Sequence, residues 1–324
     1  MKTTSVLTDD EVGILLTAAV YAPSIHNTQP WRFEVHGPVI DVLLDEERTL
    51  PATDPAGRAA RIGIGAAVVN IRVAAAMLGH QSRVAPNPDP QHPAMAARIF
   101  LAARETAVPV LSGLYGELRR RHTYRGPLLD RAVPPKVLQQ LEEAAQSEGA
   151  RLDWLGQTEL TQLSTILRRT DDDDLHDEDR LHERLRWIGG DRPDDGVQDS
   201  TLGPLPTHPA FVRDLSAGFD SKHRSQAVYE TQPAIAVLST RDEDTGAWIQ
   251  AGQALQRVLL MATSYDLTAS FLNQVLERTA PRSQVRELIG GRSWPQMVIR
   301  IGYPAQPNGR TPRRDWRDSF DQWF

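Results

Sequence analysis

The sequence predicts an α+β fold made of two tandem halves with the same order of elements. Two observations lead to this prediction. Each half of the 324-residue chain shows a helix, a strand, a long central helix and a further strand in that order. Aligning Gly65 with Gly252 also aligns several apolar or small residues of the two long helices. We therefore expect halves at residues 1–108 and 109–324.

The elements of the N-terminal half follow from capping, periodicity and turn residues. Thr8 precedes a run of acidic residues and then an apolar periodicity, which is typical of a capped helix start. Gly79 closes the long helix of this half. The predicted elements are a helix at 8–21, strands at 31–35 and 39–44, a helix at 54–78, a proline-rich loop at 84–93 and a strand at 97–102.

The C-terminal half repeats this order around an additional segment. Its predicted elements are helices at 109–118, 134–144 and 160–169, a strand at 151–155, an insertion at 171–209, a strand at 234–239, helices at 247–265 and 281–289, and a strand at 296–303. The insertion is acidic at its start and then rich in Gly, Asp and Pro, so we expect it to be exposed. Its acidic run is interpreted as a solvated face, because its histidines do not share a helix face as metal ligands would.

Composition excludes several classes of protein. The chain contains no cysteine, so disulfides, thiolate metal sites and thiol catalysis are excluded, and redox chemistry would need a cofactor. A net charge of −6 without a basic stripe disfavours a nucleic-acid partner. No uncharged apolar run approaches the roughly 20 residues of a membrane span. We expect a soluble cytoplasmic protein that binds no metal.

A polar loop between two prolines is the sharpest local motif. It runs from Pro23 to Pro30 and contains Ser24, His26 and Asn27, directly between a predicted helix and a predicted strand. Its backbone and side-chain groups could bind a planar polar ligand. The alternative is an ordinary helix-to-strand turn whose polar residues satisfy local hydrogen bonds.

Two basic motifs lie in the C-terminal half. Arg121, His122, Thr123 and Arg125 place two guanidinium groups on either side of a hydroxyl, a combination that suits a phosphate monoester. A basic helix C-terminus that complements the helix dipole is an equally good interpretation. The pair Arg313 and Arg314 follows the last predicted strand, where such pairs are often merely solvated.

Taken together, these motifs resemble those of the nitroreductase family of FMN-dependent oxidoreductases, most closely its tandem Acg-type branch. In that family an Arg-x-Ser/Thr-x-Arg motif and basic residues near the C-terminus bind the phosphate of flavin mononucleotide (FMN). A Pro-Ser-x-x-Asn-x-Gln-Pro-Trp loop reaches the same flavin from the opposite subunit. The resemblance extends over nearly the whole chain and implies a nitroreductase-like fold in which the two halves form a pseudo-dimer.

The resemblance also implies how many flavins one chain binds. The N-terminal half has the loop but not the arginine motif, and the C-terminal half has the reverse. One composite site would be complete and its twin would lack both parts, so we expect one FMN per chain. The residues implied as FMN ligands are Pro23, Ser24, His26, Asn27, Arg121, His122, Thr123, Arg125, Arg313 and Arg314, with Gln250 at the pyrimidine edge and Ser270, Phe271 and Asn273 alongside the ring. Gln250 could equally be a solvated helix residue.

Three functions remain open at this point. The resemblance implies an oxidoreductase in which NAD(P)H reduces FMN, and a nitro compound, quinone or other small molecule is then reduced. The first alternative is a protein that stores flavin beneath a lid, for which residues 187–209 are a candidate unless they form an ordinary surface excursion. The second is an interaction protein without flavin. The chain would act as a monomeric pseudo-dimer or as a homo-oligomer.

Overall fold

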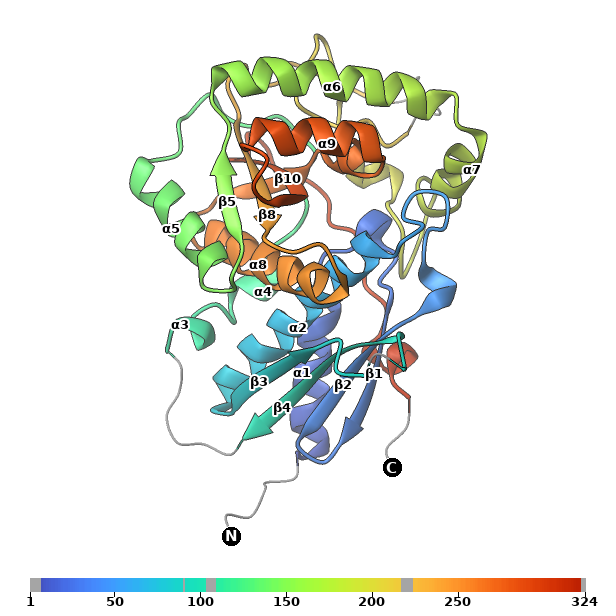
Figure 1. Cartoon of the computed structure of the whole chain (residues 1–324), viewed down its shortest axis with the longest axis vertical. Coiled ribbons are helices and arrows are strands. Elements are labelled where there is room, and N and C mark those ends of the chain that lie inside the picture. Colours follow the sequence, from blue (N-terminus) through green and yellow to red (C-terminus); the bar gives the residue numbers. More distant parts are fainter. Residues whose placement is uncertain (1–6, 90, 103–108, 217–223, 322–324) are drawn as a thin grey trace.

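The computed structural model describes residues 7–89, 91–102, 109–216 and 224–321. It contains two four-stranded antiparallel sheets, one from each half of the chain, with two long helices packed between them (Figure 1). The strand orders are β1-β2-β4-β3 and β5-β8-β10-β9. Each sheet therefore has the same topology, and the order of elements around α2 in the first half is repeated around α8 in the second.

The N-terminal half consists of two helices and four strands. They are α1 (Asp9–Val20), β1 (Trp31–His36), β2 (Val39–Leu44), α2 (Arg58–Leu78), β3 (Gln81–Pro86) and β4 (Met95–Ala102). Thr8 caps α1, as the sequence predicts, and its hydroxyl accepts a hydrogen bond from the Glu11 amide. The expectation of a loop at 84–93 is wrong in its first part, because β3 pairs with β4 along its whole length despite ending in a proline. At the edge of the sheet a proline costs no ladder hydrogen bond.

The C-terminal half carries the second sheet and additional helices. Its elements are α3 (Pro109–Ser112), α4 (Glu117–Arg120), α5 (Pro135–Gln146), β5 (Arg151–Trp154), α6 (Gln157–Leu175), α7 (Glu178–Trp187), β6 (Leu205–Pro206), β7 (Gln226–Ala227), β8 (Ala234–Thr240), α8 (Thr245–Ser264), β9 (Thr268–Phe271), α9 (Thr279–Leu288) and β10 (Trp294–Gly302). Short 3-10 turns include Ile25–Asn27 and Asn273–Leu276. The predicted helix at 109–118 is broken into α3 and α4, and β9 and α7 were not predicted.

Two glycines allow the central helices to pack closely. A Cβ atom added to Gly65 would lie 2.1 Å from the carbonyl oxygen of Ile249, and one added to Gly252 would lie 2.0 Å from that of Ile62. These two contacts are related to each other in the way that a two-fold axis relates the contacts of a symmetric dimer. Helix α2 is long and apolar enough to span a membrane, but 78% of its most apolar window is buried, as expected of a core helix.

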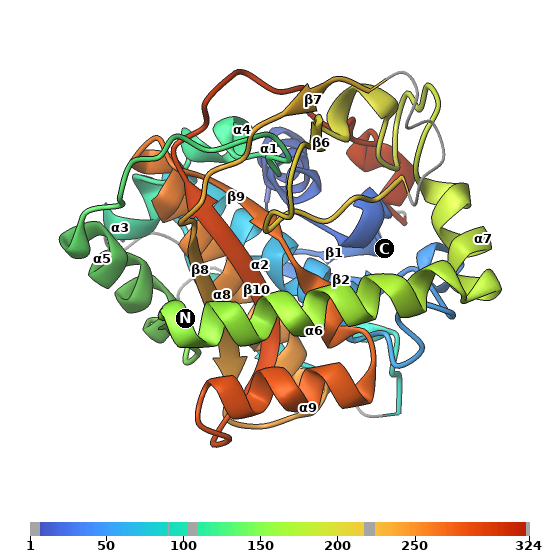
Figure 2. The same ribbon diagram turned by 90° about the horizontal axis from the view of Figure 1, so that it is seen from above.

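The insertion lies against both halves. Helix α7 and the irregular segment after it run along the side of the molecule that also holds the C-terminal segment (Figures 1 and 2). The predicted exposed insertion at 171–209 is thus partly wrong. Its first residues continue α6, and α7 forms its middle part. Arg180, Glu183 and Arg184 of α7 are buried because they contact other elements of the chain.

Candidate functional site

The two halves enclose a cavity at their junction, which we call the main cavity. Its empty volume is about 890 Å³ including the solvent in its open mouth. Its walls come from the polar loop, the start of α2, the basic motif, β9 and the segment after α7. Among the lining residues are Pro23, Ser24, Ile25, His26, Arg58, Gly63, Thr123, Arg125, Val212, Arg213, Leu215, Ser270, Phe271 and Asn273.

The polar loop has an unusual backbone. His26, Asn27 and Gln29 have positive φ angles of 46°, 56° and 52°, and none of them is a glycine. Each such residue costs on the order of 1–3 kcal/mol of strain and persists only where neighbouring contacts enforce it. Here the Ser24 hydroxyl accepts a hydrogen bond of 2.9 Å from the Gln29 amide. Strain of this kind is concentrated at functional sites, which favours the ligand-binding interpretation of the loop over the ordinary turn.

Four residues of the loop, Pro23 to His26, line the main cavity, and Asn27 does not. Asn27 instead donates hydrogen bonds of 3.0 Å to the carbonyl oxygens of Gly196 and Pro312. It therefore joins the loop to the insertion and to the C-terminal segment. The buried Nε2 of His26 has no hydrogen-bond partner among the described residues, and burial together with nearby arginines holds the pKa of His26 well below its usual value.

In the basic motif, too, some residues line the main cavity and others do not. Thr123 and Arg125 line the main cavity. Arg121 lies behind them, where its Nη2 donates to the carbonyl oxygen of Tyr21 at 3.0 Å. His122 points elsewhere, with its Nδ1 3.0 Å from the carbonyl oxygen of Arg120.

The C-terminal arginines also differ from each other. Arg313 Nη1 donates to the Asn27 side-chain oxygen at 2.8 Å, and its Nη2 lies 3.4 Å from the carbonyl oxygen of Ala22. Arg313 thus lies close to Arg121 at the end of α1. The guanidinium of Arg314 turns away and donates to the carbonyl oxygen of Asp318. Only the backbone amide of Arg314 contacts the loop, through Gln29.

Three of these arginines have no acidic partner among the described residues; Arg121 is buried, and Arg125 and Arg313 are partly buried. Among the described residues, no carboxylate lies within ion-pair distance of Arg121, Arg125 or Arg313. Burial lowers the pKa of Arg121 to about 9 and the pKa values of Arg125 and Arg313 to about 10. The Nε atoms of Arg121 and Arg313 have no hydrogen-bond partner. Burying unpaired charge is costly, so an anion at this position would remove a large penalty.

Arg58 is a cavity residue that the sequence did not reveal. It is buried at the first turn of α2 and donates hydrogen bonds to the carbonyl oxygens of Gln296 and Leu276. Burial lowers its pKa to about 10. At the sequence level it resembles any charged residue in the first turn of a helix, although a cation is unfavourable there. The unfavourable position of a cation at a helix N-terminus was the one sequence feature that could have pointed to Arg58.

Three of the four remaining predicted residues line the main cavity. The hydroxyl of Ser270 accepts a hydrogen bond from Arg300, and the side-chain oxygen of Asn273 accepts one of 2.9 Å from the Val298 amide. These contacts, together with β9, fix the wall that also contains Phe271.

Gln250 lies outside the main cavity, which corrects its expected place at the ring edge. In the alignment of the two long helices, Gln250 corresponds to Gly63. Gly63 is a lining residue, whereas the Gln250 amide nitrogen packs against Gly149, at 2.3 Å from where a Cβ of that glycine would lie. Gln250 therefore occupies the position where a twin of the main cavity would begin. The rotation of α8 about its axis directs the Gln250 side chain toward the connection between α5 and β5. The sequence motifs do not indicate this rotation.

The segment after α7 covers the main cavity. Val212, Arg213 and Leu215 line it, just beyond the predicted lid at 187–209. The predicted lid is itself held on the loop, because Gln29 Nε2 donates to the carbonyl oxygen of Asp194 at 2.8 Å. Arg48 adds an ion pair to Asp195 and stacks on Trp187. We refer to residues 188–216 as the cover segment.

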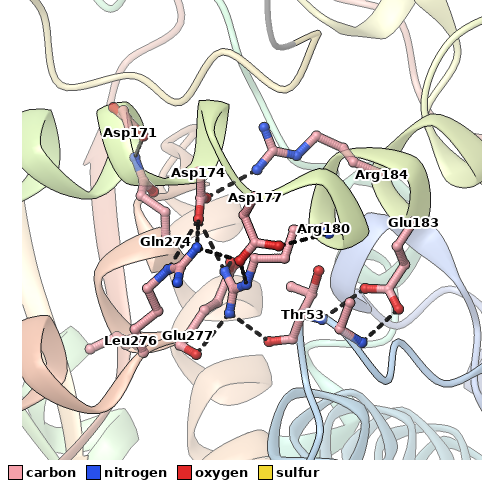
Figure 3. A network of polar contacts seen from close by, with 12 residues as sticks. Thr53, Asp171, Asp174, Asp177, Arg180, Glu183, Arg184, Gln274, Leu276 and Glu277 are labelled. Carbon is pink, nitrogen blue, oxygen red and sulfur yellow. Dashed lines mark hydrogen bonds and ion pairs between the residues drawn. The ribbon is translucent and has the colours of Figure 1, made fainter.

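A buried network of acids and arginines joins α6, α7 and the segment around Glu277 (Figure 3), and Arg213 links it to the cover segment. Glu277 pairs with Arg213 at 2.6 Å and with Arg180 at 3.1 Å. Asp174 pairs with Arg180 at 3.2 Å and with Arg184 at 3.0 Å. The expectation that the acidic run is a solvated face is therefore wrong for Asp174, because arginines distant in sequence surround it. The network joins α6 and α7 to Arg213, the charged residue of the cover segment that lines the main cavity.

Comparisons with known proteins agree with the α+β architecture. The model of the nitroreductase family matches residues 118–303. The Mycobacterium tuberculosis H37Rv protein named "Putative NAD(P)H nitroreductase acg" is 29% identical over 98% of this chain and 97% of its own length. A second protein of that organism, named "Putative NAD(P)H nitroreductase Rv3131", is 31% identical over 94% of this chain and 90% of its own length.

Solved structures resemble the chain more distantly. A nitroreductase with bound FMN from Bacteroides fragilis is 15% identical, with a TM-score of 0.38, over 62% of this chain and 94% of its own. An iodotyrosine deiodinase bound to FMN and 3-iodo-L-tyrosine is 13% identical, with a TM-score of 0.41, over 62% of this chain and 95% of its own.

Proposed function

Because the chain belongs to the nitroreductase family, we propose that it is an FMN-dependent NAD(P)H oxidoreductase with one FMN in the main cavity. The observation that carries this proposal is the group of buried arginines without acidic partners beside a strained polar loop. Thr123 and Arg125 of the basic motif and Ser24 and His26 of the polar loop come from opposite halves of the chain and line this one cavity.

The phosphate end of the site would be formed by Arg121, Thr123, Arg125 and Arg313. A phosphate dianion can accept several charge-assisted hydrogen bonds from guanidinium groups, which are roughly twice as strong as neutral ones. Arg121 and Arg313 repel each other, and this repulsion contributes to the lowered pKa of Arg121. A dianion between them would reverse that repulsion into attraction.

The ring end of the site would be formed by Ser24 and His26 on one side and by Ser270, Phe271 and Asn273 on the other. Arg58 would place a positive charge at this end, where it can donate to a carbonyl oxygen. His26 stays neutral at physiological pH, so it can donate or accept a hydrogen bond without adding charge. The apolar parts of Phe271, Val212 and Leu215 would exclude water.

FMN, when bound, supplies the hydride-accepting group through which NAD(P)H can pass electrons to a nitro compound, a quinone or another oxidised small molecule. The chain's own contribution is to bind, orient and desolvate. Arginines at both ends would fix the position of a long ligand, and the cover segment, whose residues Val212, Arg213 and Leu215 line the cavity, would limit access to its face.

A second candidate is a protein that stores FMN without turnover. The specific observation in its favour is the dense anchoring of the cover segment, which involves Asn27, Gln29 and Arg48 on one side and Glu277 on the other. Such anchoring would slow the entry of a hydride donor.

Anaerobic titration of the purified protein with NADPH or NADH separates the two candidates. An oxidoreductase loses the visible flavin absorbance within seconds of adding a stoichiometric amount of donor. A store stays yellow with either donor while dithionite still bleaches it. A colourless protein that cannot be reconstituted with FMN contradicts both.

A further inference from the structure

A second cavity adjoins the main one, with an empty volume of about 800 Å³ including its mouth. It lies between the loop that precedes α2, the start of α8 and one face of α9. Arg58, Ala59 and Glu277 line both cavities, so the two cavities adjoin at these residues. Figure 3 shows Thr53 and Glu277, two residues of its wall, lying close together although they come from opposite halves of the chain.

Two arginines of α9, Arg282 and Arg286, line this cavity together with Arg278, which directly precedes α9. Of these three, Arg286 alone has no acidic partner among the described residues. Arg282 pairs with Glu243 at 2.6 Å, and Arg278 pairs with Asp177 at 2.7 Å. Arg286 has no ion pair among the described residues. Its guanidinium stacks on Trp294, with its carbon 3.9 Å from the ring centroid, and its Nε donates to the carbonyl oxygen of Ser293.

This arrangement makes Arg286 a preorganised cation. Stacking on Trp294 and the Nε hydrogen bond fix the plane of the guanidinium, while its two terminal nitrogens have no hydrogen-bond partner among the described residues. A fixed guanidinium fork loses little entropy when it binds a phosphate. The hydroxyls of Thr279 and Ser283 lie on the same wall and can donate to the same group.

We propose that the second cavity binds the 2′-phosphoadenosine end of NADPH, with Arg286 contacting the 2′-phosphate. The proposal rests on the proposed function, because the nicotinamide end would then reach into the adjoining main cavity. Arg278 and Arg282 are each paired with an acid, and Arg58 donates to the carbonyl oxygens of Gln296 and Leu276. Arg286 is therefore the residue with both terminal nitrogens available to distinguish a phosphate monoester from a hydroxyl. The chain would therefore prefer NADPH over NADH.

Calorimetric titration of the full-length protein with adenosine 2′,5′-bisphosphate and with 5′-AMP tests the site without any turnover. We expect the bisphosphate to bind at least about tenfold more tightly than 5′-AMP, and Arg286→Ala to remove that difference. The matched control is Arg292→Ala, since Arg292 is exposed, close in sequence and absent from the lining of the cavity. Equal affinities of the two nucleotides, or an unchanged preference in Arg286→Ala, would overturn the proposal.

Kinetics then separates NADPH from a free nucleotide as the occupant. The KM for NADPH should rise about tenfold or more in Arg286→Ala, while the KM for NADH stays the same. Bisphosphate binding that depends on Arg286 without any change in the NADPH-to-NADH ratio would contradict NADPH as the occupant. Visible absorbance, recorded on each variant, shows independently whether FMN is bound, so a failure of the proposed function is recognised separately.

Discussion

At the scale of single residues, the defining feature is positive charge that has been buried without a partner. Arg121, Arg125 and Arg313 come from two segments almost 200 residues apart, and their guanidinium groups donate to carbonyl, amide or hydroxyl oxygens. Neutral acceptors cannot compensate for the desolvation of a cation as an anion does. This makes the three arginines the residues most directly tied to a phosphate.

Replacing Arg125 with alanine, or Arg121 with alanine, should weaken FMN binding by about 2–3 kcal/mol, because a buried phosphate loses a charge-assisted partner. The dissociation constant from fluorescence titration of the apoprotein with FMN measures this. Arg119→Ala is the matched control, since Arg119 is exposed and stacks on Tyr21 nearby. Unchanged FMN retention in both test variants would refute the phosphate assignment.

His26 predicts a specific pH dependence of stability. Its folded-state pKa lies below that of the unfolded chain, so both states are neutral above about pH 6.5. Below that pH the unfolded state takes up a proton that the folded state does not, and stability falls by up to about 1.4 kcal/mol per pH unit. His26→Asn should reduce this slope between pH 7 and 5, because asparagine tolerates the positive φ and does not titrate.

Denaturant unfolding at several pH values measures the slope, with the exposed His208→Asn as control. A slope that is the same in His26→Asn and in the unmodified protein would contradict the buried neutral state of His26.

At the scale of elements, the polar loop and the cover segment form one unit. Asn27 exchanges hydrogen bonds with Gly196 in both directions, since the Gly196 amide also donates to the Asn27 carbonyl oxygen. The strained loop is thus hydrogen-bonded directly to the cover segment. A substitution in the loop should therefore lower the protection of the cover segment more than it lowers the protection of the core.

Asn27→Gly tests this coupling, because glycine accepts the positive φ but removes the side-chain amide. We expect faster hydrogen exchange at residues 188–204 and little change in β1 and β2. The control is Gln139→Ala on α5, whose side chain is exposed and bonds only to Glu143. Equal protection of residues 188–204 in Asn27→Gly would show that the amide does not hold the cover segment.

The elements that sequence could predict are those with local signals. Capping at Thr8 and helical periodicity located α1, α2, α5 and α8 closely. Burial of Asp174 could not be predicted, because it depends on Arg180, Arg184 and Arg278, of which the last is 104 residues away. The polar loop was found from its motif, but the direction of Asn27 depends on an insertion whose path has no periodic pattern.

At the scale of the whole molecule, the two halves meet at a reciprocal contact between their central helices. The exchanged contacts of Gly65 and Gly252 with Ile249 and Ile62 lie at the crossing of α2 and α8. Outside this crossing the two halves differ at the positions that would line a binding site. Gly63 lines the main cavity, whereas its counterpart Gln250 packs on Gly149. The asymmetry supports the proposal of a single site per chain.

Gly65→Ala should destabilise the chain by about 3 kcal/mol or more, because the added methyl group meets backbone atoms that can move only if the helices separate. Thermal and denaturant unfolding measure the loss. Gly13→Ala in α1 is the matched control, since its Cβ would make an ordinary contact of 3.8 Å with Trp316; it should be neutral or stabilising by up to about 1 kcal/mol. Similar stabilities of the two variants would contradict the close crossing.

The most direct test of the whole account is the amount of FMN released per chain by the purified, FMN-reconstituted protein after denaturation. Flavin fluorescence calibrated against protein concentration gives this ratio. We predict one FMN per chain, lost when Arg121 and Arg125 are both replaced by alanine. Two FMN per chain, or none after reconstitution, would contradict a single composite site built from the two halves.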